Sequence, residues 1–173
     1  MRHVRRGGVY VRVADPSWRN PLSGEYARSR GGRWNPPGAF AVVYLNASLE
    51  LARALIRGRL ESRGIRPEDV LPAAGPVLVH TTVPEDYYGN AVTDAGLRAV
   101  GLPSSYPLDG RGRVVPHRVC QPIGQLAWSE GELGIACRSA TPDAPPHGGE
   151  ELAYFDRQRL IVDEVEAFAN WFQ

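Results

Sequence analysis

Gly31-Gly32-Arg33-Trp34-Asn35-Pro36-Pro37-Gly38, followed closely by Ala41-Val42-Val43-Tyr44, is the stretch that decides how this chain folds and where its site lies. It predicts a glycine-rich loop that leads into a buried strand, with an arginine held in the loop and a tyrosine near the strand's end. Glycines let a backbone approach an anion closely, and a guanidinium group offers a planar fork of donors that matches phosphate or carboxylate oxygens. We therefore expect a phosphate-bearing ligand here, with Arg33 and Tyr44 as the first candidates to bind it.

The length and apolar content of the chain predict a single domain with one full hydrophobic core, spanning residues 1–173. No stretch approaches the roughly 20 apolar residues that a membrane span requires, and no long apolar run follows the basic N-terminus. We therefore expect a cytoplasmic protein with no membrane partner. Cys120 and Cys137 are isolated in the sequence, so each is expected to be a buried free thiol.

The basic residues of the chain are all arginine, because it contains no lysine. This excludes Schiff-base chemistry and a P-loop lysine. Residues 1–33 hold eight arginines against Asp15 and Glu25, which favours an anionic ligand for this part of the chain. The net charge of the whole chain is only +1, so we expect no direct contact with nucleic acid. The four histidines are scattered singly, without metal-ligand spacing, and we expect no metal.

The expected helices and strands do not alternate strictly, which favours an α+β fold over a doubly wound sheet. We expect strands at 8–13, 40–45, 76–83, 134–140 and 152–155, a long loop at 15–38, and a helix at 49–61 that Asn46 or Ser48 caps. Further along, we expect one short helix at 94–100 within an otherwise irregular 84–118, a helical turn at 122–128, a loop at 143–149 and a closing amphipathic helix at 163–172.

Taken together, these motifs resemble the RES domain family over roughly residues 8–160. The resemblance rests on Tyr10-Val11-Arg12, GGRWNPPG at 31–38, VVYLNAS at 42–48 with its helix, Gly124 and Trp128, and GIACRSA at 134–140 followed by ELAYF at 151–155. It implies an ADP-ribosyltransferase-like fold, with a mixed β core and flanking helices. It also implies a toxin that consumes NAD by hydrolysis, by phosphorolysis or by transfer of ADP-ribose to a protein acceptor, and whose usual partner is an Xre-type helix-turn-helix antitoxin.

The same resemblance assigns roles to individual residues. It places Arg12 and Arg33 at the phosphates and ribose of NAD, Tyr44 against the nicotinamide ring and Ser139 at a polar contact in the cleft. Trp34 and Asn35 belong to the same expected binding loop, and Arg33, Tyr44 and Ser139 are the expected catalytic group. Breaking the nicotinamide–ribose bond builds positive charge on the sugar, so the chemistry needs a held pyrophosphate, a clamped ring and a negative charge.

Each candidate also has a purely structural interpretation. Trp34 would fill the core, Asn35 would bond to the backbone of its own loop, and Ser139 would satisfy an amide at the end of a strand. Arg12 would form a buried ion pair with an acid from the C-terminal part of the chain, and Tyr44 would be a plain core residue.

The chain departs from the family pattern at the residue that would supply the negative charge. The family's glutamate lies three positions beyond an alanine that matches Ala52, and this chain has Leu55 there. Glu50 and Glu61 flank Leu55 by five and six residues, which places neither on the same helical face. The pair at 150–151 offers two further carboxylates that would enter from another direction. Losing one preorganised electrostatic partner typically costs on the order of 100- to 1,000-fold in rate.

Three functions therefore stay open at the level of sequence. The first is an NAD-cleaving toxin, which the arginine loop and Tyr44 favour. The second is a protein that binds NAD or a related nucleotide with weak or no turnover, which Leu55 favours. The third is an enzyme that uses the same cleft for a different reaction.

Overall fold

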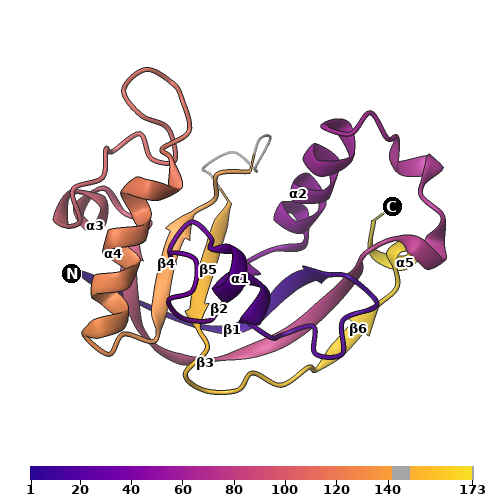
Figure 1. The fold of residues 1–173 in the computed structure, drawn as a ribbon, viewed down its shortest axis with the longest axis horizontal. Coiled ribbons are helices and arrows are strands. Elements are labelled where there is room, and N and C mark those ends of the chain that lie inside the picture. The colour runs from indigo at the N-terminus through magenta and orange to yellow at the C-terminus, as the bar shows by residue number, and fades with distance from the viewer. Residues whose placement is uncertain (142–148, 173) are drawn as a thin grey trace.

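The computed structural model describes residues 1–141 and 149–172, and within them it shows a mixed α+β unit built on one strongly curved sheet (Figure 1). The strands are β1 (His3–Ala14), β2 (Val42–Asn46), β3 (Val77–Ala91), β4 (Gly134–Arg138), β5 (Glu150–Phe155) and β6 (Glu164–Glu166). The helices are α1 (Glu25–Arg30), α2 (Leu49–Glu61), α3 (Asp94–Ala99), α4 (His117–Ser129) and α5 (Phe168–Trp171), with short 3-10 turns at Pro67–Asp69 and Pro72–Ala74.

The sheet has the strand order β1-β2-β5-β4-β3-β6, and β1 also pairs with β3. The β1–β3 ladder is long and antiparallel, whereas β3 and β4 run parallel over the short register from Gly89 to Ala91. The remaining ladders are antiparallel. Because β1 pairs with both β2 and β3, the strands β1, β2, β5, β4 and β3 close into a ring. The β1–β3 ladder therefore faces β2, β5 and β4 across the inside of this ring.

Strand alternation sorts the apolar side chains into separate clusters. On β2, Val43 and Leu45 pack with residues of β1 and β3 in the cluster that fills the inside of the ring of strands. Val42 lies on the opposite side of β2, in a second cluster that also contains residues of α3, α4 and the loop around Trp34. Tyr44 packs against this second cluster. This second side of β2, β5 and β4 carries the candidate site.

Helix α2 has the bounds that the sequence predicts, 49–61, and Ser48 is its N-cap. The Ser48 hydroxyl accepts a hydrogen bond from the backbone N–H of Leu51 at 3.2 Å, which satisfies one of the free donors of the first turn. Helices α2 and α5 together cover Val11 and Leu78 on the outer side of the β1–β3 ladder. Leu51 also lies beside Gly149, so the start of α2 flanks the start of β5.

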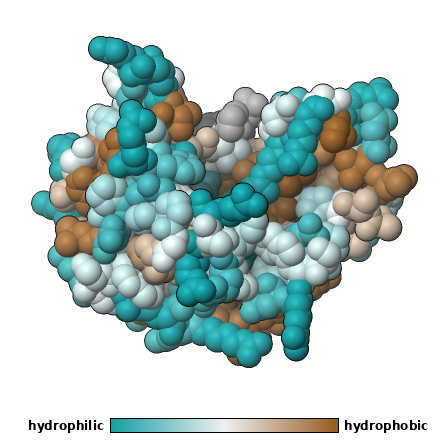
Figure 2. All heavy atoms as spheres, viewed as in Figure 1, coloured by the Kyte–Doolittle hydropathy of each residue, from teal (hydrophilic) through white to brown (hydrophobic). Residues whose placement is uncertain are grey.

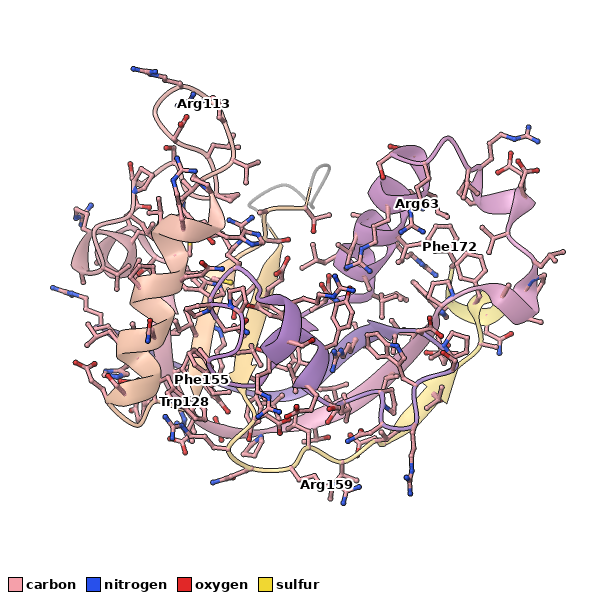
Figure 3. All side chains as sticks on the ribbon, viewed as in Figure 1. Arg63, Arg113, Trp128, Phe155, Arg159 and Phe172 are labelled. Atoms are coloured by element: carbon pink, nitrogen blue, oxygen red, sulfur yellow. The ribbon has the colours of Figure 1, made fainter. Side chains whose placement is uncertain are left out.

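Helix α4 covers the loop that contains Trp34. Its Gly124 lies so close to the Trp34 backbone that an added Cβ would overlap the Trp34 carbonyl oxygen. The Trp128 ring stacks on Phe40 with ring centroids 4.7 Å apart, and it meets the edge of Phe155 at 5.8 Å (Figure 3). These contacts fix α4 and the loop against β5 as one packed layer.

The expected helix at 163–172 is wrong. Glu164–Glu166 instead forms β6, which pairs antiparallel with Leu78, Val79 and His80 of β3, and the His80 ring contacts the Glu166 carboxylate at 2.5 Å. Only Phe168–Trp171 is helical, and its aromatic residues pack under α2, where Phe172 is visible in Figure 3. The edge of β3 that does not pair with β1 offers backbone hydrogen bonds to this segment, and these override its local helical pattern.

Other parts of the chain contain more regular structure than the sequence predicts, because some elements are longer and one helix is additional. Strand β3 continues to Ala91, well into the stretch 84–118 that was expected to be irregular, and α1 lies within the expected long loop 15–38. Helix α4 begins at His117, so Pro122 lies inside it rather than at its start. The expected loop at 143–149 falls almost wholly outside the described residues.

Both cysteines are free and buried, as expected. None of the helices in the described ranges has the length and apolar character needed to cross a membrane.

Candidate functional site

The loop at 31–38 follows α1 and crosses in front of β4 and β5 (Figure 1). Gly31 and Gly38 both adopt positive φ values, 76° and 77°, a region that side chains other than glycine's rarely enter. Between them, the Asn35 side-chain amide donates to the carbonyl oxygens of Ala27 at 2.7 Å and Phe40 at 3.2 Å. Asn35 therefore ties the end of α1 to the segment that leads into β2.

Tyr44 braces this loop from β2. Its hydroxyl donates to Oδ1 of Asn35 at 2.9 Å and accepts from the backbone N–H of Trp34 at 2.9 Å. Gly32 lies directly over the ring, where any Cβ would overlap the Tyr44 hydroxyl. Burial raises the pKa of Tyr44 well above its usual value, so the phenol stays protonated at neutral pH. The hydroxyl is thus engaged by the loop.

Trp34 anchors the loop to the sheet. Its side chain is fully buried, and Nε1 donates to Sγ of Cys137 on β4 at 3.2 Å. Its ring lies 6.2 Å from that of Tyr106, measured between centroids. These contacts match the structural interpretation of Trp34 as a residue that fills the core. They also fix the backbone next to Arg33.

Arg33 is half-buried between the loop and α4. Its Nη1 donates to the carbonyl oxygen of Val115 at 2.7 Å. Burial acts to lower the pKa of Arg33, but the neighbouring Tyr106 and Cys120 raise it, and the net pKa is above the usual value. The guanidinium is therefore a fixed positive charge. At the start of α4, burial and this positive charge both lower the pKa of His117.

Ser139 and Glu151 meet at the neighbouring ends of β4 and β5. Ser139 is buried, and its hydroxyl donates to Oε1 of Glu151 while accepting from the backbone N–H of Thr141 at 3.1 Å. The Ser139 backbone N–H also donates to the carbonyl oxygen of Gly149 at 2.6 Å. Ser139 thus does more than satisfy a strand-end amide, because its hydroxyl orients a carboxylate.

The strand register puts Glu151 on the same side of the sheet as Tyr44. Glu151 pairs with Cys137 on β4 and with Asn46 on β2, and Tyr44 pairs with Ala153, two residues further along β5. Burial raises the pKa of Glu151, while the Ser139 hydrogen bond and the positive charges of Arg33 and Arg59 act in the opposite direction. The carboxylate therefore lies within the electrostatic reach of two guanidinium groups.

The structure does not bring Arg12 to Arg33 and Tyr44, contrary to the expectation from sequence. Arg12 shares its side of β1 with Tyr10 and Ala14, which pack in the cluster on the other side of β2 from Tyr44. Its Nη1 donates to the carbonyl oxygen of Ser23 at 3.0 Å, and its guanidinium lies 5.4 Å from the centre of the Trp18 ring. Burial lowers the pKa of Arg12 to about 10, and the charge of Asp156 opposes this shift.

Helix α2 forms the opposite wall of the site. Leu51, Leu55 and Arg59 follow one another at intervals of four residues, so they share one helical face. Leu51 contacts Gly149 and Arg59 acts electrostatically on Glu151, which directs this face toward the ends of β4 and β5. The surface is hollowed between the sides formed by α2 and α4 (Figure 2). Leu55 therefore presents an apolar side chain on this wall.

Comparison with known families decides the identity of this arrangement. The family model described as the RES domain matches residues 9–170. The chain belongs to the RES domain family.

Known relatives of this RES domain include the NAD(+) phosphorylase MbcT of Mycobacterium bovis and of Mycobacterium tuberculosis, each 34% identical over 113 residues. The match covers 64% of this chain and 56% of each relative, so it spans about half the length of those proteins. A chain from the crystal structure of the M. tuberculosis MbcT–MbcA toxin–antitoxin complex superposes with a TM-score of 0.76 at 23% identity, over 98% of this chain and 91% of that one. This structural likeness concerns the fold.

The sequence of this RES domain offers Glu151 only as one of several alternative carboxylates, and it gives no signal for Arg59. The signal for Glu151 lies in the alternation of Glu151, Ala153 and Phe155 on one side of β5, but that pattern does not reveal which side faces Tyr44. Within the described ranges, no group of three or more histidine, cysteine, aspartate or glutamate side chains is arranged to hold a metal ion.

Proposed function

We propose that this RES domain is an NAD-consuming toxin that breaks the bond between nicotinamide and ribose. The observation that carries the proposal is the convergence of Arg33, Tyr44, Ser139 and Glu151 on one side of β2, β5 and β4, in a chain of this family. A positive fork, an aromatic ring, a hydroxyl and a carboxylate are the groups that this bond cleavage requires.

Each residue takes a distinct role in the proposed complex with NAD. Arg33 binds the pyrophosphate, since its charge is fixed and its guanidinium extends from a glycine-rich loop. The Tyr44 ring stacks on nicotinamide, and Ser139 contacts the ribose. Trp34 and Asn35 hold the loop in the geometry that presents Arg33. Arg12 supports the fold from the other side of the sheet, where it joins β1 to the segment around Ser23.

Phosphate is the acceptor that we favour for ADP-ribose. As the bond between the ribose C1″ and the nicotinamide nitrogen breaks, its electron pair stays with the nitrogen, which removes the positive charge of the ring. Positive charge then develops on the ribose, and an oxygen of hydrogen phosphate forms the new bond to C1″. The products are neutral nicotinamide and ADP-ribose 1″-phosphate. The relatives named NAD(+) phosphorylase support this acceptor over water or a protein side chain.

The setting of the enzyme is part of the proposal. We propose an ADP-ribosyltransferase-like architecture, because a curved mixed sheet carries the site at the ends of β4 and β5. We also propose an antitoxin partner of the Xre helix-turn-helix type, supported by the likeness to a chain taken from a toxin–antitoxin complex. Since NAD is available in the cytoplasm, we place the enzyme there.

The direct test is to incubate the purified protein with NAD and inorganic phosphate and to follow nicotinamide release by chromatography. The proposal predicts nicotinamide and ADP-ribose 1″-phosphate in equal amounts, with the phosphorylated product identified by mass spectrometry. Leu55 favours a second function, in which the protein binds NAD without efficient turnover. Calorimetric binding of NAD without nicotinamide release would support that second function and contradict the first.

A further inference from the structure

The wall formed by α2 has no carboxylate where it faces the site. Leu55 lies one turn beyond Leu51 and one turn before Arg59, on the face that points toward the start of β5. Glu50 and Glu61, at the two ends of α2, are both exposed. An enzyme that builds positive charge on a ribose therefore has to take its negative charge from another element.

Strand β5 supplies a carboxylate from the opposite side of the site. Glu151 is held by the Ser139 hydroxyl, and Ser139 is itself fixed by the backbone N–H of Thr141 and the carbonyl oxygen of Gly149. Glu151 pairs with Asn46 on β2 and with Cys137 on β4, so two ladders set the position of Glu151 along the sheet. A side chain held in this way is preorganised, which is the condition for strong electrostatic stabilisation of a transition state.

The preceding residue provides an internal contrast. Glu150 has the same side chain and a neighbouring position, but strand alternation directs it to the other side of β5. There it pairs with Arg6 of β1, with Oε1 accepting from Nε at 2.5 Å and Oε2 accepting from Nη2 at 2.8 Å. Glu150 is therefore committed to an ion pair that links β5 to β1. Glu151 instead lies on the Tyr44 side of the sheet, where the Ser139 hydroxyl donates to it and the charges of Arg33 and Arg59 act on it.

We propose that Glu151 is the catalytic carboxylate of this RES domain and takes over the task that Leu55 cannot perform. This inference rests on the proposed NAD cleavage. As the bond from C1″ to the nicotinamide nitrogen breaks, the Glu151 carboxylate stabilises the positive charge on the ribose, while Ser139 holds the carboxylate in place. The carboxylate neither gives nor takes a proton when hydrogen phosphate attacks C1″, because the attacking dianion needs no base.

The test compares Glu151→Gln with the matched control Glu150→Gln in the full chain. Glutamine keeps the size of the side chain and an oxygen that accepts from Ser139, so the Glu151→Gln protein is expected to fold with unchanged Tm and to bind NAD with unchanged Kd. Its kcat for nicotinamide release is expected to fall by about 100-fold or more. Glu150→Gln is expected to retain the wild-type kcat, because Glu150 lies on the other side of β5.

A second variant separates the loss of a carboxylate from a local disturbance. Leu55→Glu, introduced into the Glu151→Gln protein, returns a carboxylate to the site from the α2 wall and is expected to recover at least 10-fold of the lost kcat. A wild-type kcat in Glu151→Gln would overturn the inference, as would a loss of kcat that a matching loss of NAD affinity or Tm explains. If the wild-type protein released no nicotinamide, the proposed function would fail first, and the inference with it.

Discussion

The hydroxyl of Tyr44 donates a hydrogen bond to Oδ1 of Asn35, 2.9 Å away, and so joins β2 to the loop that presents Arg33. The same hydroxyl accepts from the backbone N–H of Trp34. Both capacities of the phenol are thus used within the protein. The hydroxyl is therefore a structural group, and we propose that the ring is the part of Tyr44 that contacts nicotinamide.

Replacing Tyr44 by phenylalanine is expected to lower stability while sparing NAD affinity. The substitution leaves the Asn35 oxygen and the Trp34 N–H without their partner, which costs about 1–3 kcal/mol in the free energy of unfolding. The ring remains, so the Kd for NAD is expected to change less than threefold. Urea unfolding and calorimetry measure the two quantities, with Tyr87→Phe at an exposed tyrosine as the control. Wild-type stability in Tyr44→Phe would contradict the structural role of the hydroxyl.

Gly124→Ala is expected to separate α4 from the Trp34 loop. The added methyl group would overlap the Trp34 carbonyl oxygen, and relieving this overlap is expected to cost about 1–3 kcal/mol. Gly58→Ala on α2 is the matched control, because no atom lies within 4 Å of its added Cβ. That control is expected to gain roughly 0.5–1 kcal/mol from helix propensity. Equal changes in the urea midpoints of the two variants would refute the close approach.

Arg33→Ala is expected to abolish measurable NAD binding. A charge-assisted bidentate contact to a phosphate is worth about 1.5–3 kcal/mol per hydrogen bond, so its loss should weaken binding by at least about 100-fold. Arg113→Ala serves as control, since Arg113 is exposed, pairs with Asp109 and lies on a loop beyond α3 (Figure 3). Calorimetry that finds unchanged affinity in a folded Arg33→Ala protein would remove Arg33 from the site.

The pH dependence of cleavage is expected to show Glu151 on its acid side. Because burial raises the pKa of Glu151, its carboxylate accepts a proton at a higher pH than an ordinary glutamate does. The active form is the carboxylate, so kcat should fall as the pH is lowered through that raised pKa. Within residues 1–141 and 149–172, the other titratable groups coupled to Glu151 keep their protons in this range. They are Arg33, Tyr44, Arg59 and Cys137. A pH profile of Glu151→Gln, measured at a constant concentration of the hydrogen phosphate dianion, should lack this acid limb, and an unchanged limb would assign it to another group.

The sequence predicts those parts of the fold whose signals are local. Helix α2 has the predicted bounds because Ser48 caps it and its apolar spacing is helical. The segment 163–172 carries an equally plausible local pattern, but β6 forms there because β3 has backbone groups at its edge that only the folded structure brings near. Pairing partners far apart in the chain override propensity, and propensity alone gives no warning of them.

The same distinction applies to the site. Arg33, Asn35 and Tyr44 lie close in the sequence, and one glycine-rich loop brings them together, so their grouping was predictable. Whether Arg12 joins them depends on which side of β1 faces which layer, and the register places it with Trp18 instead. The position of Glu151 likewise depends on the ladders of β5 with β2 and β4.

The measurement that tests the central claim most directly is product analysis after incubating the purified wild-type chain with NAD and inorganic phosphate. The site built from Arg33, Tyr44, Ser139 and Glu151 predicts one nicotinamide for each NAD consumed, with ADP-ribose 1″-phosphate as the second product. Intact NAD after prolonged incubation with protein that is folded by circular dichroism would contradict the claim.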